Sequence, residues 1–351
     1  MNWTSRQKGL SLIEVMVALA LSLVITLGLT QIFSSNSQSF RVAEASARLQ
    51  ETGRLATSII GREIRNASYW GCLGDQGIRD GRLNSILDQS TFDVSALLRG
   101  LDGENGSGPG GSDRLSMGGV NGNSAVSVTF QPSQQAANLR VDDSDSFNEN
   151  DILIVTNCSQ GDVFQVTNVN TNNEVVVHNS GNVSDGPGNS TQALSTNYND
   201  DPDGASVFRP RQQRFYLRDN ADGIRELVTD GIGITGSGIG NFSTPVALLQ
   251  DVMDFQIQFG VDTNQNGTID AWEDPEGLTL SGRTQADNTI AVRLSVLVRS
   301  SNDRVTDGGQ SYCYPGWLDC ASDSSLLTEA ADDDTFLYRV YSTTVTMRNR
   351  T

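Results

Sequence analysis

Histidine is almost missing from this chain, since His178 is the only one among 351 residues. Imidazole is the commonest general base near neutral pH and a frequent zinc ligand, so this scarcity argues against a histidine-based hydrolase and against a zinc site. No nucleophile, base and orienting group occur at a recognisable spacing. The glycines of residues 231–240 also lack the lysine of a phosphate-binding loop. We therefore expect that the protein is not an enzyme.

Positive charge is scarce as well. The chain has 24 Lys and Arg against 42 Asp and Glu, which gives a formal net charge of −18. Such a surplus of negative charge repels phosphate backbones, so we expect no nucleic-acid partner, while it suits hard divalent cations that take oxygen ligands. Hydrophobic residues make up 37% and aromatic residues 7%, and 35 glycines indicate many turns, which argues against a long helical bundle or a coiled coil.

The apolar residues are concentrated in the amino-terminal segment. The opening MNWTSRQKG is polar and carries Arg6 and Lys8, and no charged residue occurs from Val15 to Phe40, a stretch of 26 residues. As a helix rising about 1.5 Å per residue, this stretch is long enough to cross a hydrocarbon layer about 30 Å thick. A secretory signal peptide is the alternative, but it would have a shorter apolar region followed by a small-residue cleavage site. The basic residues before the span place the amino terminus in the cytoplasm and the rest of the chain outside.

Glu14 interrupts the apolar segment that begins at Leu10. A carboxylate inside a bilayer costs about 2.5–3.5 kcal/mol on insertion scales, so it needs a partner cation or a function. The alternative is that Glu14 lies at headgroup depth. The string KGLSLIEV at residues 8–15 combines a basic leader, Gly9, the hydrophobic Leu10 directly after it and a glutamate four positions further on.

This combination resembles the class III signal of type IV prepilins and of type II secretion pseudopilins. The resemblance implies that a prepilin peptidase on the cytoplasmic face removes the leader, residues 1–9, by cutting after Gly9, and that Leu10 is then N-methylated. It also implies that Glu14 pairs with the new amino terminus of a neighbouring subunit. The protein is then expected to span the inner membrane once, with its carboxyl-terminal domain in the periplasm, and to pass into a pilus at the cell surface.

Beyond the span the pattern becomes that of an amphipathic helix. Apolar and small residues recur at steps of three and four, at Leu49, Gly53, Ala56, Ile60, Ile64 and Ala67. Joined to the span, this stretch gives the long amino-terminal helix that pilin-like proteins share, with a transmembrane half at residues 10–36 and an amphipathic half at 37–68. We expect an α+β fold in which this helix packs on an antiparallel β-sheet. Residues 69–351 would form a β-rich periplasmic or extracellular domain, with a β-rich lobe inserted around residues 72–217.

After Tyr69 short strand-like runs replace the helical pattern. We predict strands at residues 125–130, 151–156, 163–169, 175–178, 214–217, 255–261, 289–299 and 336–347. In the run 289–299 apolar residues alternate with Arg293, Ser295 and Arg299, which predicts a strand that is buried on one face only. Residues 101–123, 179–205 and 230–242 are predicted to be loops or insertions.

Three segments resemble the PilW-type minor pilins of Gram-negative type IV pili. They are the closing string YRVYSTTVTMRNR at residues 338–350, the segment YWGC at residues 69–72, and the strand at 252–261 that leads into an Asp-rich loop. The resemblance implies a protein that assembles with other minor pilins and with the major pilin, and that primes or caps the tip of the filament. Two alternatives stay open, namely a large pseudopilin of a type II secretion system and a calcium-stabilised adhesin at the pilus tip.

Four cysteines lie in the part of the chain that we expect to be exported, namely Cys72, Cys158, Cys313 and Cys320. Two disulfides are the default in that compartment, and three connectivities are open. A Pro-Gly turn lies between Cys313 and Cys320, which favours this pair and therefore also the pair Cys72 and Cys158. A metal site is the rival interpretation, but neither pair has C-x-x-C spacing.

Residues 262–273, DTNQNGTIDAWE, match the calcium-loop pattern D-x-[DN]-x-[DN]-G-x5-E. Oxygen ligands for Ca²⁺ would come from Asp262, Asn264, Asn266, Thr268 through its carbonyl, Asp270 and Glu273. The alternative is an ordinary turn, because the chain is rich in Asn, Asp and Gly and the preceding segment has the pattern of a strand instead of an EF-hand helix. We expect calcium binding with a dissociation constant of about 10⁻⁴–10⁻³ M.

A modest basic cluster occurs in this acidic chain, formed by Arg209, Arg211, Arg214 and Arg218. Surface ion pairing explains it, and a contact with an acidic neighbouring subunit is the alternative. His178 follows three valines and is expected at the end of a strand.

Overall fold

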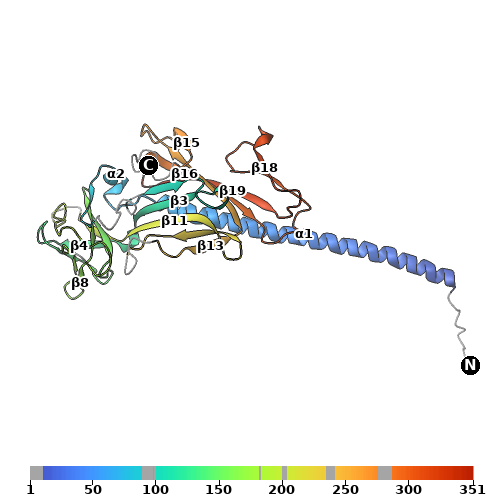
Figure 1. Ribbon diagram of the computed structural model, residues 1–351, viewed down its shortest axis with the longest axis horizontal. Coiled ribbons are helices and arrows are strands. Elements are labelled where there is room, and N and C mark those ends of the chain that lie inside the picture. Colours follow the sequence, from blue (N-terminus) through green and yellow to red (C-terminus); the bar gives the residue numbers. More distant parts are fainter. Residues whose placement is uncertain are drawn as a thin grey trace, which may run out of the picture.

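The structure is a computed structural model that describes residues 11–88, 98, 100–181, 183–199, 204–234, 242–275 and 287–350. Gly9 and Leu10, on which the predicted cleavage and methylation fall, lie outside the described residues. One long helix leaves a β-rich head at one end, and a lobe of short strands lies at the opposite end (Figure 1). The α+β class that the sequence predicts is confirmed.

Helix α1 (Leu12–Asn66) has 55 residues and is therefore about 80 Å long. Its first turn is capped by Ser11, whose Oγ accepts the N–H of Glu14 at 3.2 Å. The helix ends where Ala67 turns to an extended conformation and donates its N–H to the carbonyl of Ile64. The predicted helix end at about residue 68 is therefore confirmed to within two residues.

The second half of α1 packs on a four-stranded antiparallel sheet with the order β15-β14-β16-β19. The strands are β14 (Val252–Val261), β15 (Ala271–Glu273), β16 (Thr289–Arg299) and β19 (Tyr338–Thr346). The helix buries Ala45, Leu49, Gly53, Ala56, Ile60 and Ile64 against this sheet and the adjoining core. Gly53 is required by close approach, because a Cβ there would lie 2.1 Å from Cδ2 of Tyr341 on β19.

Strand β16 is buried on both faces, so the prediction of a half-buried strand is wrong. Ser295 is fully buried, although it alternates with the apolar residues. The segment that connects β16 to β19 folds back over this face, where the N–H of Gly316 donates to Ser295 Oγ at 2.9 Å. Ser342 of β19 also bonds to this hydroxyl at 2.9 Å. The polar Ser295 is therefore covered by a segment that is distant in the sequence, and the alternating pattern of the strand gives no sign of that cover.

A second, five-stranded antiparallel sheet shares the main core with α1 and has the order β13-β12-β11-β3-β2. Its strands are β2 (Leu101–Glu104), β3 (Arg114–Val120), β11 (Pro210–Asp219), β12 (Arg225–Asp230) and β13 (Val246–Gln250). Strands β2 and β3 lie in residues 101–123, which were predicted to form a loop, so that prediction is wrong. Glycine is needed inside β3, since a Cβ on Gly119 would lie 2.9 Å from the carbonyl oxygen of Tyr69. Because this segment is rich in glycine and serine, its sequence resembles a loop, although it forms a strand with Leu115 and Met117 buried.

The inserted lobe is an eight-stranded sheet with the order β1-β7-β6-β10-β4-β5-β9-β8. The strands are β1 (Leu83–Ser85), β4 (Val126–Phe130), β5 (Asn138–Val141), β6 (Ile152–Thr156), β7 (Gly161–Gln165), β8 (Asn168–Asn170), β9 (Val175–Val177) and β10 (Ser206–Phe208). It has its own apolar core around Leu153, Phe164 and Val207. The run predicted as one strand at 163–169 is divided between β7 and β8. The lobe lies beyond the end of α1, on the side away from the amino terminus (Figure 1).

Short elements complete the described chain. They are α2 (Gly74–Arg79), the 3₁₀ turns η1 (Pro109–Gly111), η2 (Gly122–Ser124) and η3 (Ser324–Leu326), and the hairpin of β17 (Ser311–Cys313) with β18 (Leu327–Glu329). The predicted loops 179–205 and, after β12, 231–242 contain only isolated β-bridges in their described parts.

Both disulfides that the sequence favoured are present. Cys72 is bonded to Cys158, which joins the segment after α1 to the turn between β6 and β7 of the lobe. Cys313 is bonded to Cys320, which closes the loop after β17. The first bond spans 86 residues of sequence and therefore restricts the unfolded chain far more than the second, which spans 7.

His178 is a fully buried residue of the lobe, and its ring lies 4.9 Å from the ring of Phe164, centroid to centroid. Burial lowers the pKa of His178 from 6.5 to about 4. Because the folded-state pKa is the lower one, protonation favours unfolding, and stability is lost as the pH falls from about 6.5 toward 4. That gap, at about 1.4 kcal/mol per pH unit, corresponds to about 3 kcal/mol.

We therefore expect His178→Leu to reduce the acid sensitivity of the head. The difference in melting temperature between pH 7 and pH 4.5 should be smaller for this variant than for the unsubstituted protein. Equal losses in the two proteins would show that other groups control acid unfolding.

Candidate functional site

The first half of α1 has an apolar surface that the rest of the described chain leaves uncovered. Its large side chains from Leu12 to Phe33 are 44–79% exposed. Among the described residues, α1 is the one helix long and apolar enough to cross a membrane, and none of its most apolar window is buried. An apolar surface of this size is stable only in a bilayer or against other apolar helices. The structure therefore presents this half of α1 as a surface for membrane insertion and helix packing.

Glu14 lies in the first turn of α1, at the start of this apolar surface. Its side chain is exposed and forms no ion pair with any residue that the structure describes. The positive end of the helix dipole favours a carboxylate at this position but does not neutralise it. In an apolar environment the carboxylate would need an external cation, and a protonated amine from another chain is chemically suited to that task.

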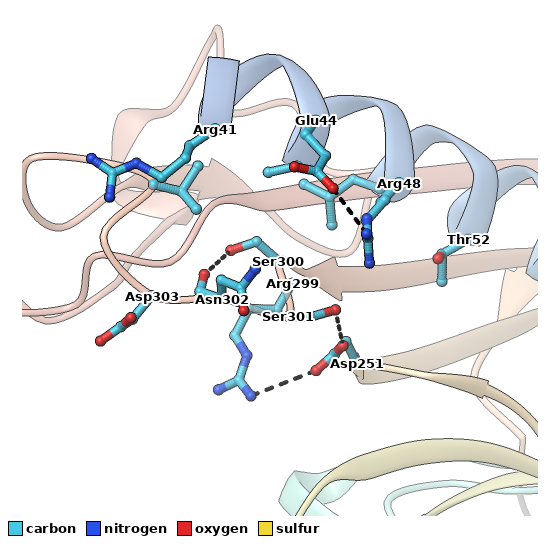
Figure 2. Close-up of a pocket in the computed structure, with 13 residues that line it drawn as sticks. Arg41, Glu44, Arg48, Thr52, Asp251, Arg299, Ser300, Ser301, Asn302 and Asp303 are labelled. Carbon is cyan, nitrogen blue, oxygen red and sulfur yellow. Dashed lines mark hydrogen bonds and ion pairs between the residues drawn. The ribbon is translucent and has the colours of Figure 1, made fainter. Parts of the chain in front are cut away.

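A polar cleft lies where α1 leaves the head, between the helix and the loop after β16 (Figure 2). On the helix side, Arg48 pairs with Glu44 at 2.9 Å, and on the loop side Arg299 approaches Asp251 at 3.9 Å (Figure 2). Close by, Gln38 Nε2 donates to the carbonyl of Val305 at 3.0 Å. The two ion pairs each lie within one wall of the cleft, and the bond from Gln38 to Val305 joins the base of the exposed helix to the head beside it. The sequence analysis missed it, although Glu44 and Arg48 have the i, i+4 spacing of a helical ion pair.

The basic cluster on and before β11 is neutralised within the chain, which confirms ion pairing as its explanation. The pairs are Arg209 with Asp151, Arg211 with Glu63, Arg214 with Asp230 and Arg218 with Glu226. In every pair the carboxylate is at most 10% exposed, so the acidic partner is the buried one. Because Glu63 belongs to α1, its bond with Arg211 also fixes the end of the helix to the five-stranded sheet.

The end of the chain is a structural feature that the sequence analysis missed. Arg350 has a side chain only 3% exposed, and its guanidinium lies 3.1 Å from Asp75. It also donates to Ser68 Oγ at 3.1 Å, while Asn349 Nδ2 donates to the carbonyl of Ala67 at 2.9 Å. These contacts satisfy carbonyl and hydroxyl groups at the end of α1. No local pattern distinguishes this buried arginine from its exposed neighbour Arg348.

The predicted calcium loop joins β14 to β15 and is therefore part of a β-hairpin, not of a helix–loop–helix unit. Asp262 is buried and accepts the N–H groups of Asn266 at 3.2 Å and of Gly267 at 2.8 Å. Asp270 accepts the N–H of Thr263 and the side-chain amide of Asn264, at 2.8 and 3.0 Å. Gly267 has a φ of +81°, as the sharp turn requires.

The acidic residues of this loop do not form a metal-binding group of their own. Within the described residues no three His, Cys, Asp or Glu side chains are grouped in a way that would hold a metal ion. Three of the six predicted ligands, Asn264, Asn266 and the carbonyl of Thr268, would bind through neutral oxygens. A grouping of His, Cys, Asp and Glu side chains alone does not include them. The donor set suits Ca²⁺, which accepts amide and carbonyl oxygens. Calcium binding stays a prediction.

Comparison with known proteins identifies two matching family models. Residues 4–30 match the prokaryotic N-terminal methylation motif. Residues 214–349 match the type IV pilus-assembly protein W family, PilW. The first region covers residues 4–9 of the predicted leader and the exposed start of α1, and the second contains the sheet on which α1 packs. No curated protein matches the chain.

Among solved structures, the chain is similar to the type IV-like pilin TTHA1219 from Thermus thermophilus. The two are 12% identical, the match covers 86% of this chain and 97% of that chain, and the TM-score is 0.35. The similarity to PilW rests on the sequence match over residues 214–349. A methylation motif at the start of an exposed apolar helix, together with a region similar to the PilW family of type IV pilus-assembly proteins, supports a membrane-anchored minor pilin that takes part in type IV pilus assembly.

Proposed function

We propose that the mature protein occupies the tip of a type IV pilus, where it primes or caps the filament with other minor pilins and the major pilin. The proposal includes removal of the leader after Gly9 by prepilin peptidase on the cytoplasmic face and N-methylation of Leu10. Before assembly the protein would be held in the inner membrane with its head in the periplasm. The observation that carries the proposal is the exposed carboxylate of Glu14 at the start of an uncovered apolar helix.

The electrostatics of Glu14 favour assembly over simple anchoring. An anchor gains nothing from a carboxylate at this depth, which costs about 2.5–3.5 kcal/mol in a bilayer. In a bundle of pilin helices the same group would bind the free α-amine of a neighbouring mature chain. The attraction between opposite charges is large in such a low-dielectric environment and offsets the cost of removing both from water.

The position of the lobe supports a place at the tip. An open filament is built from repeated contacts between unlike surfaces of successive subunits, so a subunit in its body needs both surfaces free. The lobe lies beyond the end of α1 on the side away from the amino terminus (Figure 1). We infer that the lobe would obstruct a further subunit on that side, which favours a terminal position over one in the body of the filament.

A deletion strain tests the proposal. Loss of surface pili and of twitching motility, with normal secretion of folded exoproteins, is the expected result. Loss of secretion with normal pili would instead show a type II secretion pseudopilin. Mass spectrometry of the cellular protein should find an amino-terminal peptide that begins at methylated Leu10. If residues 1–9 remain attached in cells whose other pilins are trimmed, the assembly proposal is wrong.

We further propose that the loop between β14 and β15 binds Ca²⁺, with Asp262 at the start of the loop and Glu273 at the end of β15 as charged ligands. Binding would fix the hairpin to the sheet that carries α1. With a dissociation constant of about 0.5 mM, 5 mM Ca²⁺ should stabilise the head by about 1–2 kcal/mol and raise its melting temperature by about 2–4 °C.

Two variants make the calcium test specific. Asp262→Ala and Glu273→Gln should each remove the increase in melting temperature on adding Ca²⁺. Asp222→Ala, in the exposed turn between β11 and β12, should leave it unchanged. The prediction fails if the unsubstituted protein shows neither a calcium-dependent heat in calorimetry nor a change in melting temperature.

A further inference from the structure

A groove beside the last turn of α1 gathers basic side chains from three distant parts of the chain. It is lined by Arg65 of α1, Arg211 of β11 and Arg348 just after β19, and we refer to it as the arginine groove. Val120 at the end of β3 and the turn after it, at residues 121–123, form another side of it. Only the tertiary fold brings these segments together.

The charge of the arginine groove is opposite to that of the molecule. No Asp or Glu is among the residues that line it, although the chain has 42 acidic residues against 24 basic ones. Arg65 and Arg348 are exposed and make no ion pair with any part of the chain that the structure describes. Arg211 is paired, but its partner Glu63 is buried behind it. Two uncompensated guanidinium groups therefore face one hollow, where a concave surface concentrates the positive potential.

The remaining polar groups of the arginine groove suit hydroxyl groups. Asn66, Asn121 and Asn123 line it and are exposed. A side-chain amide offers both a donor and an acceptor, as a sugar hydroxyl does. Tyr69 adds an aromatic ring that is 37% exposed and lies against Gly122, where a Cβ would come within 3.1 Å of the ring. Aromatic rings commonly pack on the apolar faces of bound molecules.

We propose that the arginine groove binds an acidic sugar, with the carboxylate held by Arg65 and Arg348 and the hydroxyls held by the asparagine amides. Arginine presents a planar pair of donors that matches a carboxylate. An acidic protein segment is a poorer occupant, because the apolar lining residue Val120 is only 4% exposed and offers little apolar contact. A nucleic acid is a poorer one too, since the net charge of −18 repels a polymer of phosphates.

The position of the arginine groove fits contact with an external ligand. Arg65 lies 53 residues along α1 from Leu12, which places it about 80 Å from the membrane end of the helix. In a protein at the pilus tip this part of the head, with the lobe beyond it, would lie far from the membrane. The inference assigns a ligand-binding activity beyond the assembly role and does not depend on it.

Calorimetry on the full-length protein in detergent micelles tests the proposal. The acidic probes are trigalacturonate and 3′-sialyllactose, and the neutral control is lactose. At low salt we expect saturable binding of at least one acidic probe, no saturable binding of lactose, and weaker binding as salt is raised. Arg65→Gln and Arg348→Gln should each weaken binding about tenfold, the loss expected for one charge-assisted hydrogen bond. Arg54→Gln, exposed on the same helix but outside the groove, should leave it unchanged.

Three results would overturn the inference. The first is no saturable heat with either acidic sugar at up to 10 mM, and the second is equal binding of lactose. The third is tighter binding of a hexa-aspartate peptide than of the sugars, which would identify an acidic protein as the occupant. Melting curves of the variants should match that of the unsubstituted protein, since Arg54, Arg65 and Arg348 are exposed, so a loss of binding would report on the groove itself.

Discussion

Replacing Glu14 with leucine should remove the protein from pili while leaving it in the membrane. The carboxylate is exposed in an apolar helix and has no ion-pair partner among the described residues, and we propose that a neighbouring chain supplies one. Leucine removes the cost of about 2.5–3.5 kcal/mol for a carboxylate in the bilayer, which keeps the anchor at least as stable as before. It also removes the charge that would bind the amine of a neighbouring pilin. We expect the amount of protein in sheared pili to fall roughly tenfold or more, which corresponds to about 1.4 kcal/mol of lost association energy.

Immunoblots of sheared pili and of membranes measure the two pools separately. Glu44→Gln is a matched control, because Glu44 lies on the same helix but pairs with Arg48 inside the chain. This control should reach pili at the normal level. Unchanged incorporation of the Glu14→Leu variant would mean that the carboxylate has no part in assembly.

Replacing Arg350 with methionine should destabilise the head by about 3–5 kcal/mol, the loss expected when one partner of a buried ion pair is removed. Asp75, with a side chain 5% exposed, would keep Arg79 as its single partner in the cluster, at 3.1 Å. The end of α1 would also lose the bond from Arg350 to Ser68. Methionine keeps the unbranched stem, so the change mainly tests the guanidinium.

Urea unfolding followed by tryptophan fluorescence measures this loss, since Trp70 is buried close to the end of α1 in sequence and reports on this region. Arg348→Met, two residues earlier, is the control. Arg348 is exposed and makes no ion pair with the described chain, so its replacement should change the stability by less than about 0.5 kcal/mol. Similar losses for both variants would contradict a special role for the buried arginine.

Sequence reasoning succeeded where a few neighbouring residues carry the signal. The apolar run, Gly9 and Glu14 lie within one short segment, and the family match over residues 4–30 covers the same segment. Strands β14, β16 and β19 have long runs of β-branched and aromatic residues, and these were predicted within a few residues of their bounds. The cysteine pairs followed from one Pro-Gly turn and from elimination.

Sequence reasoning failed where burial depends on a distant segment. Strand β3 is rich in glycine and serine, so its sequence pattern is that of a loop. Glycine is nevertheless needed at position 119, because the backbone of Tyr69 passes close to it. Ser295 was assigned to solvent because alternation describes one strand and not what covers it. The arginine groove was missed for the same reason, since Arg65, Arg211 and Arg348 are far apart in the chain.

The sequence by itself determined the apolar amino-terminal helix, the methylation motif and the acidic residue in its first turn, because these properties belong to contiguous residues and to the solvent around them. Only the tertiary structure decided which charges are neutralised and which remain free. Arg350 is buried against Asp75 while Arg348 lines an open groove, although both are arginines and only two positions separate them. The difference arises from which distant elements pack against each side chain, and that packing is a property of the whole fold.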